Sequence, residues 1–363
     1  MTAAIVPSVD LGHDGCRERA GGALPPTREA LGIWRSRAPV GAFPHIAGKL
    51  DAESAANDYE AEIEVEWLNI DATSYRQLRQ SCAAEPDAMA TAIRAIVSER
   101  GKLHNPATGS GGVLVGRLTR LGSLSWLDEQ LVGQRVVPLA SLIATPLSLE
   151  SVGPVEPDNP QVPVVGRAIV TGRMSCAAVP DDLPLEAVLS ALDVYPAASH
   201  TKALARLGAH VLVIGCGHAG LSAVAAARET VGANGLVTVI DTSEAALELA
   251  CGIDPGVVAI AGDARDAVVL AEGFTARGLR PADLTLLCTT VEGCEGTAIL
   301  LTAADGTVLF FSTATSFSAA ALGADSLSSL ASLTIPNGFT EDRGSYLLGL
   351  LRRKPSLLQV FSR

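Results

Sequence analysis

The chain has 363 residues, enough for two domains that each bury a core, and its net charge of −12 argues against a nucleic-acid partner, which needs a basic face. It contains no apolar run of the length that crosses a membrane, and residues 1–30 lack the pattern of a signal peptide. Its seven cysteines are odd in number and widely spaced, which suits free thiols in a reducing compartment. We therefore expect a soluble, cytoplasmic protein, with residues 1–30 as a mobile N-terminal tail.

Residues 31–184 have the pattern of a β-rich domain. Residues 61–68 alternate apolar and acidic side chains, as a half-exposed strand does. The stretch from Pro154 to Pro163 holds four prolines and is interpreted as a connector. Further elements expected in this part are strands at 113–121 and 135–139 and a helix at 87–99.

Residues 185–363 alternate between short apolar strands and helices. Strands that are almost free of charge and alternate with helices indicate a parallel sheet covered on both faces. The sequence therefore predicts an α/β protein, in which an N-terminal β-rich, GroES-like domain precedes a Rossmann domain with a doubly wound parallel sheet. The expected strands are residues 211–214, 236–240, 257–260, 284–288, 307–311 and 332–335.

A glycine-rich turn lies between the first two of these strands. Gly215, Gly217 and Gly220 form a G-x-G-x-x-G motif that opens an alanine-rich helix, and the second strand ends on Asp241, 21 residues after Gly220. This order of strand, glycine turn, helix, strand and acid is typical of a dinucleotide site, with the helix N-terminus facing the pyrophosphate. Because an acid at position 241 would bind the ribose hydroxyls and repel a 2′-phosphate, we expect NAD rather than NADP.

Further polar residues follow the carboxyl ends of the expected strands, where a Rossmann sheet binds its ligands. Some of them have an alternative role. Asp263 could cap a helix, and Thr315 or Ser316 could cap the helix that follows the strand at 307–311. His218 is interpreted as a neighbour of the phosphates rather than a catalyst. The candidate cofactor contacts are His218, Ala219, Asp263, Thr289, Thr290, Ser312 and Thr313, and the candidate substrate contacts in this domain are Thr315 and Asn337.

Two polar patches in the first domain are candidates for chemistry. One is the segment 69–75 and the other is the loop 99–112, which leads into the strand at 113–121. Hydride transfer without a metal needs a group that accepts the substrate proton and donors that orient the substrate. The alternative is a surface loop, with Asp71 capping a turn. The candidate catalytic residues are Asp71, Lys102 and His104, and the candidate substrate contacts are Tyr75, Glu99, Asn105 and Ser110.

The order of the two domains resembles the medium-chain dehydrogenases, many of which hold a catalytic and a structural zinc. This chain has no C-x-x-C pair and no cysteine between Cys82 and Cys176. Gly112 and Val113 stand where a His-Glu pair is expected in the zinc enzymes. Since tetrahedral zinc needs three or four protein ligands, we expect no metal site.

Several segments together resemble one zinc-free family, the L-erythro-3,5-diaminohexanoate dehydrogenases. The resemblance runs from about residue 40 onward and implies NAD-dependent oxidation at the C3 amino carbon. The resulting imine would be hydrolysed to 5-amino-3-oxohexanoate and ammonia. The segments are EVEWLNIDATSY (64–75), IVSERGKLHNPATGSGGVLVG (96–116), LPLEAVLSALDV (183–194), FFSTATSFSAAALGADSL (310–327) and IPNGFT (335–340).

The chain departs from the family pattern at Cys176, Ala178, Cys216 and His218. These departures leave open a related β-amino or β-keto substrate. Two other functions also remain possible from the sequence: a zinc-independent ketone or enone reductase of the same superfamily, and a non-catalytic NAD-binding paralogue. The expected partners are a small β-amino acid and a second copy of the chain in a homodimer.

Overall fold

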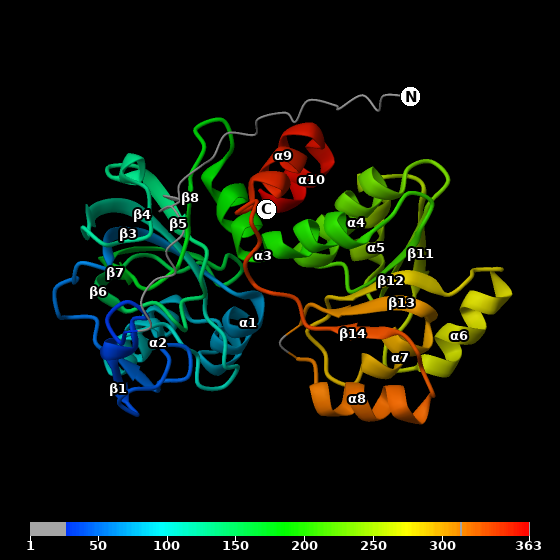
Figure 1. Cartoon of the computed structure of the whole chain (residues 1–363), viewed down its shortest axis with the longest axis horizontal. Coiled ribbons are helices and arrows are strands. Elements are labelled where there is room, and N and C mark those ends of the chain that lie inside the picture. The colour runs from blue at the N-terminus through cyan, green and yellow to red at the C-terminus, as the bar shows by residue number, and fades with distance from the viewer. Residues whose placement is uncertain (1–26, 313, 363) are drawn as a thin grey trace, which may run out of the picture.

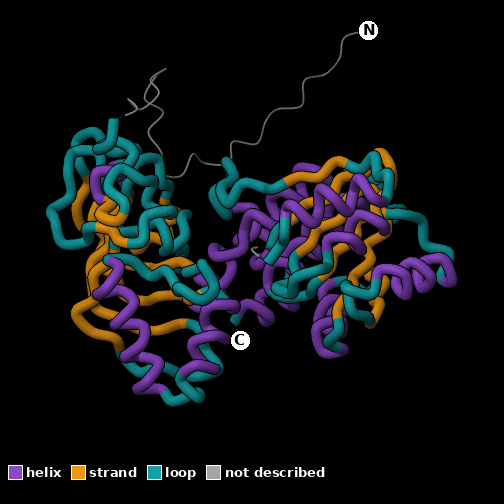
Figure 2. The backbone as a smooth tube through the Cα atoms, turned by 90° about the horizontal axis from the view of Figure 1, so that it is seen from below, coloured by secondary structure: helices purple, strands orange, loops and turns teal. Residues whose placement is uncertain are grey.

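The computed structural model describes residues 27–312 and 314–362, so most of the expected mobile tail at 1–30 lies outside the described residues. The described chain forms two lobes, each built on a sheet of six strands, and helix α3 (Leu185–Leu204) lies between them (Figure 1). Figure 2 shows the same two lobes side by side, with helices at their junction. This is the α/β arrangement expected from the sequence.

The first lobe is an antiparallel sheet with the strand order β6-β7-β3-β4-β5-β8. The expected strands and the expected helix are confirmed. The elements are β3 (Ala61–Ile70), β4 (Gly112–Leu121), β5 (Arg135–Pro138), β6 (Leu147–Val152), β7 (Gln161–Val170), β8 (Cys176–Ala178), α1 (Ala72–Ser81) and α2 (Pro86–Arg100), with β1 (Ser36–Ala38) and β2 (Lys49–Leu50) paired beside them.

The proline-rich stretch is a connector for most of its length, as expected, but its last residues belong to a strand of this sheet. Residues 153–160 join β6 to β7, and Pro163 lies within β7. The sheet tolerates this proline because its partner strand β3 has a register irregularity between Val65 and Trp67, opposite Pro163. Because of the prolines in this stretch, the ten-residue strand β7, which lies between β6 and β3, was not recognised from the sequence.

The second lobe is a parallel sheet with the order β11-β10-β9-β12-β13-β14, so the direction of winding changes between β9 and β12. All six expected strands are confirmed. Ligands of such sheets bind at the carboxyl ends of the strands beside this change of direction. The elements are β9 (His210–Ile214), β10 (Leu236–Asp241), β11 (Val257–Ala261), β12 (Ala282–Leu287), β13 (Thr302–Phe310), β14 (Ser332–Thr334), α4 (His218–Val231), α5 (Glu244–Ile253), α6 (Ala267–Ala276), α7 (Glu295–Leu300) and α8 (Phe317–Ser326).

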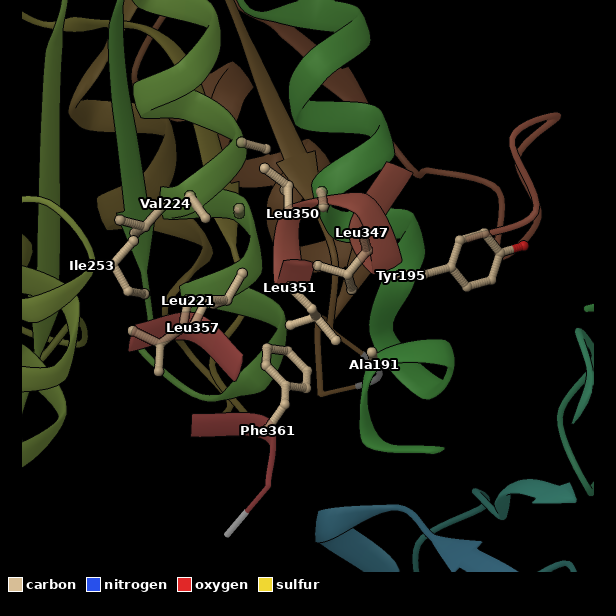
Figure 3. Close-up of a cluster of buried hydrophobic side chains, with 14 of the residues drawn as sticks. Ala191, Tyr195, Leu221, Val224, Ile253, Leu347, Leu350, Leu351, Leu357 and Phe361 are labelled. Atoms are coloured by element: carbon tan, nitrogen blue, oxygen red, sulfur yellow. The ribbon is translucent and has the colours of Figure 1, made fainter. Parts of the chain in front are cut away.

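After β14 the chain crosses back toward α3 and ends in α9 (Ser345–Arg353) and α10 (Pro355–Phe361) (Figure 1). These two helices pack against α3, α4 and α5, which closes the core at this end of the lobe. Figure 3 shows the side chains that meet there: Leu347, Leu350, Leu351, Leu357 and Phe361 from the last helices, with Ala191, Tyr195, Leu221, Val224 and Ile253.

One hydrophobic core passes through α3 and includes residues of both lobes. Val113, Val115 and Val137 on the first sheet belong to the same buried cluster as Val188 on α3 and Val213 on β9. Helix α3 therefore covers one face of the first sheet with one side and packs on α4 with another. A domain boundary near residue 185 stays a prediction, because buried contacts cross it.

Candidate functional site

Two of the three glycines of the motif have a steric reason within the protein, and the third borders open space. Gly215 has a φ of +96°, and a side chain there would meet the Thr289 backbone N at 2.7 Å. A Cβ at Gly220 would lie 1.8 Å from the carbonyl oxygen of Gly215, so α4 can approach β9 only with a glycine here. Gly217 differs, because no heavy atom lies within 4 Å of its missing Cβ. Its bare backbone thus borders open space at the N-terminus of α4.

Asp241 at the end of β10 lies against this loop. Its Oδ2 accepts a hydrogen bond from the backbone N of Cys216 at 2.7 Å, and its Oδ1 accepts one from Ser243 N at 2.9 Å. The open space over Gly217, the helix N-terminus and the neighbouring carboxylate fit a dinucleotide in the expected orientation.

The imidazole of His218 takes part in packing. His218 is the first residue of α4, and its ring stacks on Phe361 of α10 with centroids 4.6 Å apart. Burial lowers the pKa of this histidine, so the ring is neutral at neutral pH. The first turn of α4, which includes Ala219, presents backbone N–H groups toward the glycine loop, while the His218 side chain supports the C-terminal helix.

The other expected cofactor residues follow β11, β12 and β13 and so gather along the same edge of the sheet. Asp263 accepts from Arg265 N at 2.9 Å and pairs with its guanidinium, and Ser312 accepts from Ala314 N at 3.1 Å. Thr289 accepts from Val291 N at 3.3 Å, and Thr290 is exposed beside it. Thr313 lies outside the described residues.

The loop after β13 also contributes a helix cap. Ser316 accepts from Ala319 N at 3.2 Å and caps α8, as the sequence allowed. The Oγ1 of Thr315 is buried and makes no hydrogen bond within the described residues. Asn337 is held through its main chain, since its carbonyl accepts from Nε2 of His200 on α3 at 2.8 Å. The edge of the sheet is thus tied to α3.

On the other side of the junction, Asp71 begins α1. Its Oδ1 accepts from Thr73 N at 3.1 Å and Ser74 N at 3.0 Å, which caps the helix, whereas its Oδ2 is buried without a hydrogen-bond partner among the described residues. The expected catalytic loop folds onto this helix. Asn105 Nδ2 donates to Gln77 Oε1 at 2.9 Å, and Ser110 Oγ lies 2.8 Å from Ser74 Oγ. The structure therefore brings Asp71, Asn105 and Ser110 together.

Lys102 and His104 occupy different environments in that loop. Lys102 is fully buried, and its Nζ donates to the carbonyls of Pro44 at 2.8 Å and Ile143 at 2.7 Å. Burial lowers its pKa to about 8. The ammonium group of Lys102 therefore links two loops through these hydrogen bonds. His104 has a buried Nδ1 with no partner among the described residues, and burial, followed by the charge of Lys102, lowers its pKa.

Two expected substrate contacts lie elsewhere. Tyr75 is buried in the core of the first lobe, its hydroxyl donates to the Glu156 carbonyl, and burial raises its pKa to about 12. Glu99 is exposed on the last turn of α2. Neither residue lines the cavity described next.

A cavity of about 290 Å³ lies between the lobes. Phe339 of the second lobe forms one wall, and Arg173, whose guanidinium lies 5.2 Å from the centre of the Trp126 ring, is part of the other. Sequence analysis missed this cavity because its walls come from short loops far apart in the chain. The lining residues are Leu31, Pro44, His45, Leu139, Ala140, Ala144, Thr171, Gly172, Arg173, Met174, Ser175 and Phe339.

Asp193 on α3 is a second missed residue. Asn69 at the end of β3 donates from Nδ2 to Asp193 Oδ2 at 3.4 Å. Burial, together with the charge of Asp71, raises the pKa of Asp193 to about 7. A signal was present in the sequence, since Asp193 is a single acid in the otherwise uncharged run 187–199.

Within residues 27–312 and 314–362, no group of three or more His, Cys, Asp or Glu side chains is arranged to hold a metal ion. Gly112 has a φ of +108°, and a Cβ there would lie 2.0 Å from the Asn69 carbonyl oxygen, so this position excludes a histidine side chain. Over the same described ranges, every helix is too short or too polar to cross a membrane.

The antiparallel first lobe, the parallel second lobe and the glycine loop together have the fold of the medium-chain dehydrogenases. The structure is similar to a quinone oxidoreductase from Coxiella burnetii (TM-score 0.54, 15% identity, 86% of this chain and 85% of the other). It is also similar to an alcohol dehydrogenase from Escherichia coli solved with NADH (TM-score 0.51, 17% identity, 83% and 82%). At these identities the likeness shows the fold alone.

Comparison of sequences identifies the family. Residues 34–180 match the model of the L-erythro-3,5-diaminohexanoate dehydrogenase N-terminal domain. The chain is 33% identical to L-erythro-3,5-diaminohexanoate dehydrogenase from Acetoanaerobium sticklandii over 92% of its length and 97% of the relative. It is 30% identical to the enzyme of that name from Fusobacterium nucleatum, over 91% and 97%. The chain therefore belongs to the L-erythro-3,5-diaminohexanoate dehydrogenase family, as the sequence segments indicated.

Proposed function

We propose that this protein catalyses the NAD-dependent oxidative deamination of L-erythro-3,5-diaminohexanoate, or of a close β-amino acid, to 5-amino-3-oxohexanoate and ammonia. The observation that carries the proposal is the identity of 33% to a relative of that name over nearly the whole of both chains. The open glycine loop supports it, because it provides a place for the pyrophosphate of a dinucleotide.

The residues of the chain would hold the cofactor in a defined way. Backbone N–H groups at the start of α4 bind the pyrophosphate over Gly217, and the Asp241 carboxylate accepts hydrogen bonds from the ribose hydroxyls. The negative charge of Asp241 disfavours a 2′-phosphate, which supports NAD over NADP. When bound, the nicotinamide accepts the hydride from the substrate carbon.

Two of the departures from the family pattern lie away from the cavity. Cys176 is buried in the core of the first lobe, and Ala178 is exposed on β8. A third, Cys216, contacts Asp241 through its backbone N. None of these three side chains lines the cavity, so their positions do not by themselves indicate a different substrate.

An assay of NAD reduction over a panel of β-amino acids, with 3,5-diaminohexanoate included, tests the proposal. We expect NADH and the 3-oxo acid to form with the diamino acid. Calorimetry with NAD supplies the binding readout: Gly217→Ala fills the space of the pyrophosphate and abolishes binding, whereas Gly252→Ala, which also adds a Cβ in open space but on α5, leaves it unchanged. Tight NAD binding without oxidation of any amine would refute the proposal and favour a non-catalytic paralogue.

We also propose that the protein acts in the cytoplasm as a homodimer. Strand β14 is the edge of the parallel sheet, where unpaired backbone groups can join a second copy. Exposed apolar side chains surround it, and their burial in a two-fold interface would stabilise the pair. These side chains are Phe317, Leu322, Leu330, Leu333 and Ile335.

A further inference from the structure

Asp193 and Asp71 come from different lobes and lie close enough for the charge of Asp71 to act on Asp193. Asp193 belongs to α3, and Asp71 caps the start of α1, directly after β3. Asn69, two residues before Asp71, is buried and donates from Nδ2 to Asp193 Oδ2 at 3.4 Å. Asp193 on α3 is therefore held by a hydrogen bond from the first lobe.

A network of neutral groups sets the orientation of Asn69. Its Oδ1 accepts from Nε2 of Gln161 at 3.2 Å, so its amide nitrogen has to face Asp193. Gln161 is held in turn by α3, because Nε2 also lies 3.1 Å from Ser190 Oγ and 2.9 Å from the Glu186 carbonyl. The neighbours that hold Asp193 are thus uncharged, and the charge that acts on it comes from Asp71.

The two side-chain oxygens of Asp71 have different surroundings. Two backbone N–H groups at the start of α1 stabilise charge on Oδ1, while the buried Oδ2 makes no hydrogen bond to any described residue. The main chain of Asp71 is fixed as well, because its N donates to the Gly111 carbonyl at 3.3 Å. A buried carboxylate oxygen without a partner is a site for a cation or a donor.

Helix α3 links this acid pair to the edge of the parallel sheet. Tyr195, two residues after Asp193, accepts through its hydroxyl from Thr340 N at 3.3 Å, and His200 holds the Asn337 carbonyl. Both partners belong to the loop after β14, where the cofactor of such a sheet is bound. Helix α3 therefore connects the side chain that contacts Asn69 of the first lobe with the loop after β14.

We propose that Asp193 is the proton acceptor of the deamination and that Asp71 binds the reacting nitrogen beside it. This inference rests on the proposed function. An N–H bond of the C3 ammonium breaks and its proton forms an O–H bond on Asp193, which leaves the electron pair on nitrogen. That pair forms the C=N bond as the C3–H electrons leave with the hydride to NAD. The iminium charge is then balanced by Asp71, and the proton passes from Asp193 to solvent before water adds.

The electrostatics of the pair agree with this role. Burial, together with the charge of Asp71, raises the pKa of Asp193 to about 7. A general base is most effective when its pKa is close to the working pH. An ammonium between the two carboxylates also removes their mutual repulsion, so the pair favours a cationic substrate over a neutral ketone.

Asp193→Asn tests the proposal, with Glu186→Gln as the matched control, because Glu186 undergoes the same change of acid to amide on an exposed position of the same helix. We expect Asp193→Asn to lower kcat/KM for the diamino acid at least 100-fold and to remove the acid limb of the pH profile. Asp193→Glu recovers part of the rate. NAD affinity stays unchanged in all variants. The control keeps the wild-type rate and profile.

A second readout does not depend on turnover. Infrared difference spectra of the cofactor-free protein, wild type minus Asp193→Asn, should show one carboxyl that titrates near neutral pH. In the Asp71→Asn variant, the midpoint of this Asp193 titration should move toward the ordinary pKa of an aspartic acid. A wild-type pH profile in Asp193→Asn, or a carboxyl that titrates near pH 4, would overturn the inference. Failure of this inference can be distinguished from failure of the proposed function. If the proposed function is wrong, the wild-type protein itself oxidises no amine.

Discussion

Ionising Asp193 in the folded protein should cost stability that can be measured against pH. Its pKa rises from 3.8 to about 7 because of burial and the charge of Asp71. Each pKa unit corresponds to about 1.4 kcal/mol, so the ionised side chain costs the fold about 4 kcal/mol above neutral pH. Because the pKa of Asp193 is raised, the folded state binds the proton more tightly than the unfolded state does. The stabilisation that results is fully present below about pH 4 and is lost as the pH rises to about 7.

Replacing Asp193 by asparagine removes the titration but keeps the shape. Between pH 5 and pH 8 the free energy of unfolding of the variant should therefore rise relative to that of the wild type by about 3 kcal/mol. With an unfolding entropy of about 2.1 cal/mol/K per residue, this corresponds to a relative gain in Tm of about 4 °C. The comparison of two pH values cancels the loss of the Asn69 hydrogen bond, which does not titrate.

Thermal unfolding and urea titration of wild type, Asp193→Asn and Glu186→Gln at both pH values provide the measurement. The control should follow the wild type, because Glu186 is exposed. A stability difference between Asp193→Asn and wild type that is the same at pH 5 and pH 8 would show that Asp193 titrates normally, and the reasoning on the acid pair would be wrong.

Three further predictions concern other parts of the molecule. Arg35 and Glu60 are both fully buried and joined at 2.7 Å, so Arg35→Met should lower the unfolding free energy by about 3–5 kcal/mol, as urea titration would show; replacing both residues by apolar ones should restore part of it. Asp241→Asn should raise NADP affinity about tenfold or more by removing repulsion of the 2′-phosphate, and unchanged NADP binding in calorimetry would contradict the role given to Asp241. Leu330→Asp should convert the proposed homodimer to a monomer in light scattering, whereas Leu207→Asp, at an equally exposed loop position, should not.

The sequence was most informative where neighbouring residues decide the structure. The glycine turn and Asp241 could be recognised because strand, loop and helix follow one another directly, and the structure shows a steric reason for Gly215 and Gly220. Strands β9, β10 and β12 of the parallel sheet were recognisable because both of their faces are buried and the segments are nearly uniformly apolar. The helix 87–99 was found by the spacing of its buried side chains.

Features that depend on distant residues were not predictable. Asn69 and Asp193 meet although they are 124 residues apart, and no local pattern shows that α3 crosses the end of β3. The prolines around Pro163 suggested a loop, because the irregularity of β3 that accommodates them lies far away in the chain. Lys102 was selected for its chemistry, and only the folded chain shows that two carbonyls from separate loops surround its ammonium.

The core that continues through α3 limits how the two lobes can move. A hinge at residue 185 would have to pull Val113 and Val137 away from Val188 and expose apolar surface at every opening. Closure over a ligand is therefore expected as small sliding of packed elements along α3, a shear movement, rather than as rotation about a flexible joint. The first lobe produced alone would expose the side chains that α3 covers, so a fragment ending near residue 180 should aggregate.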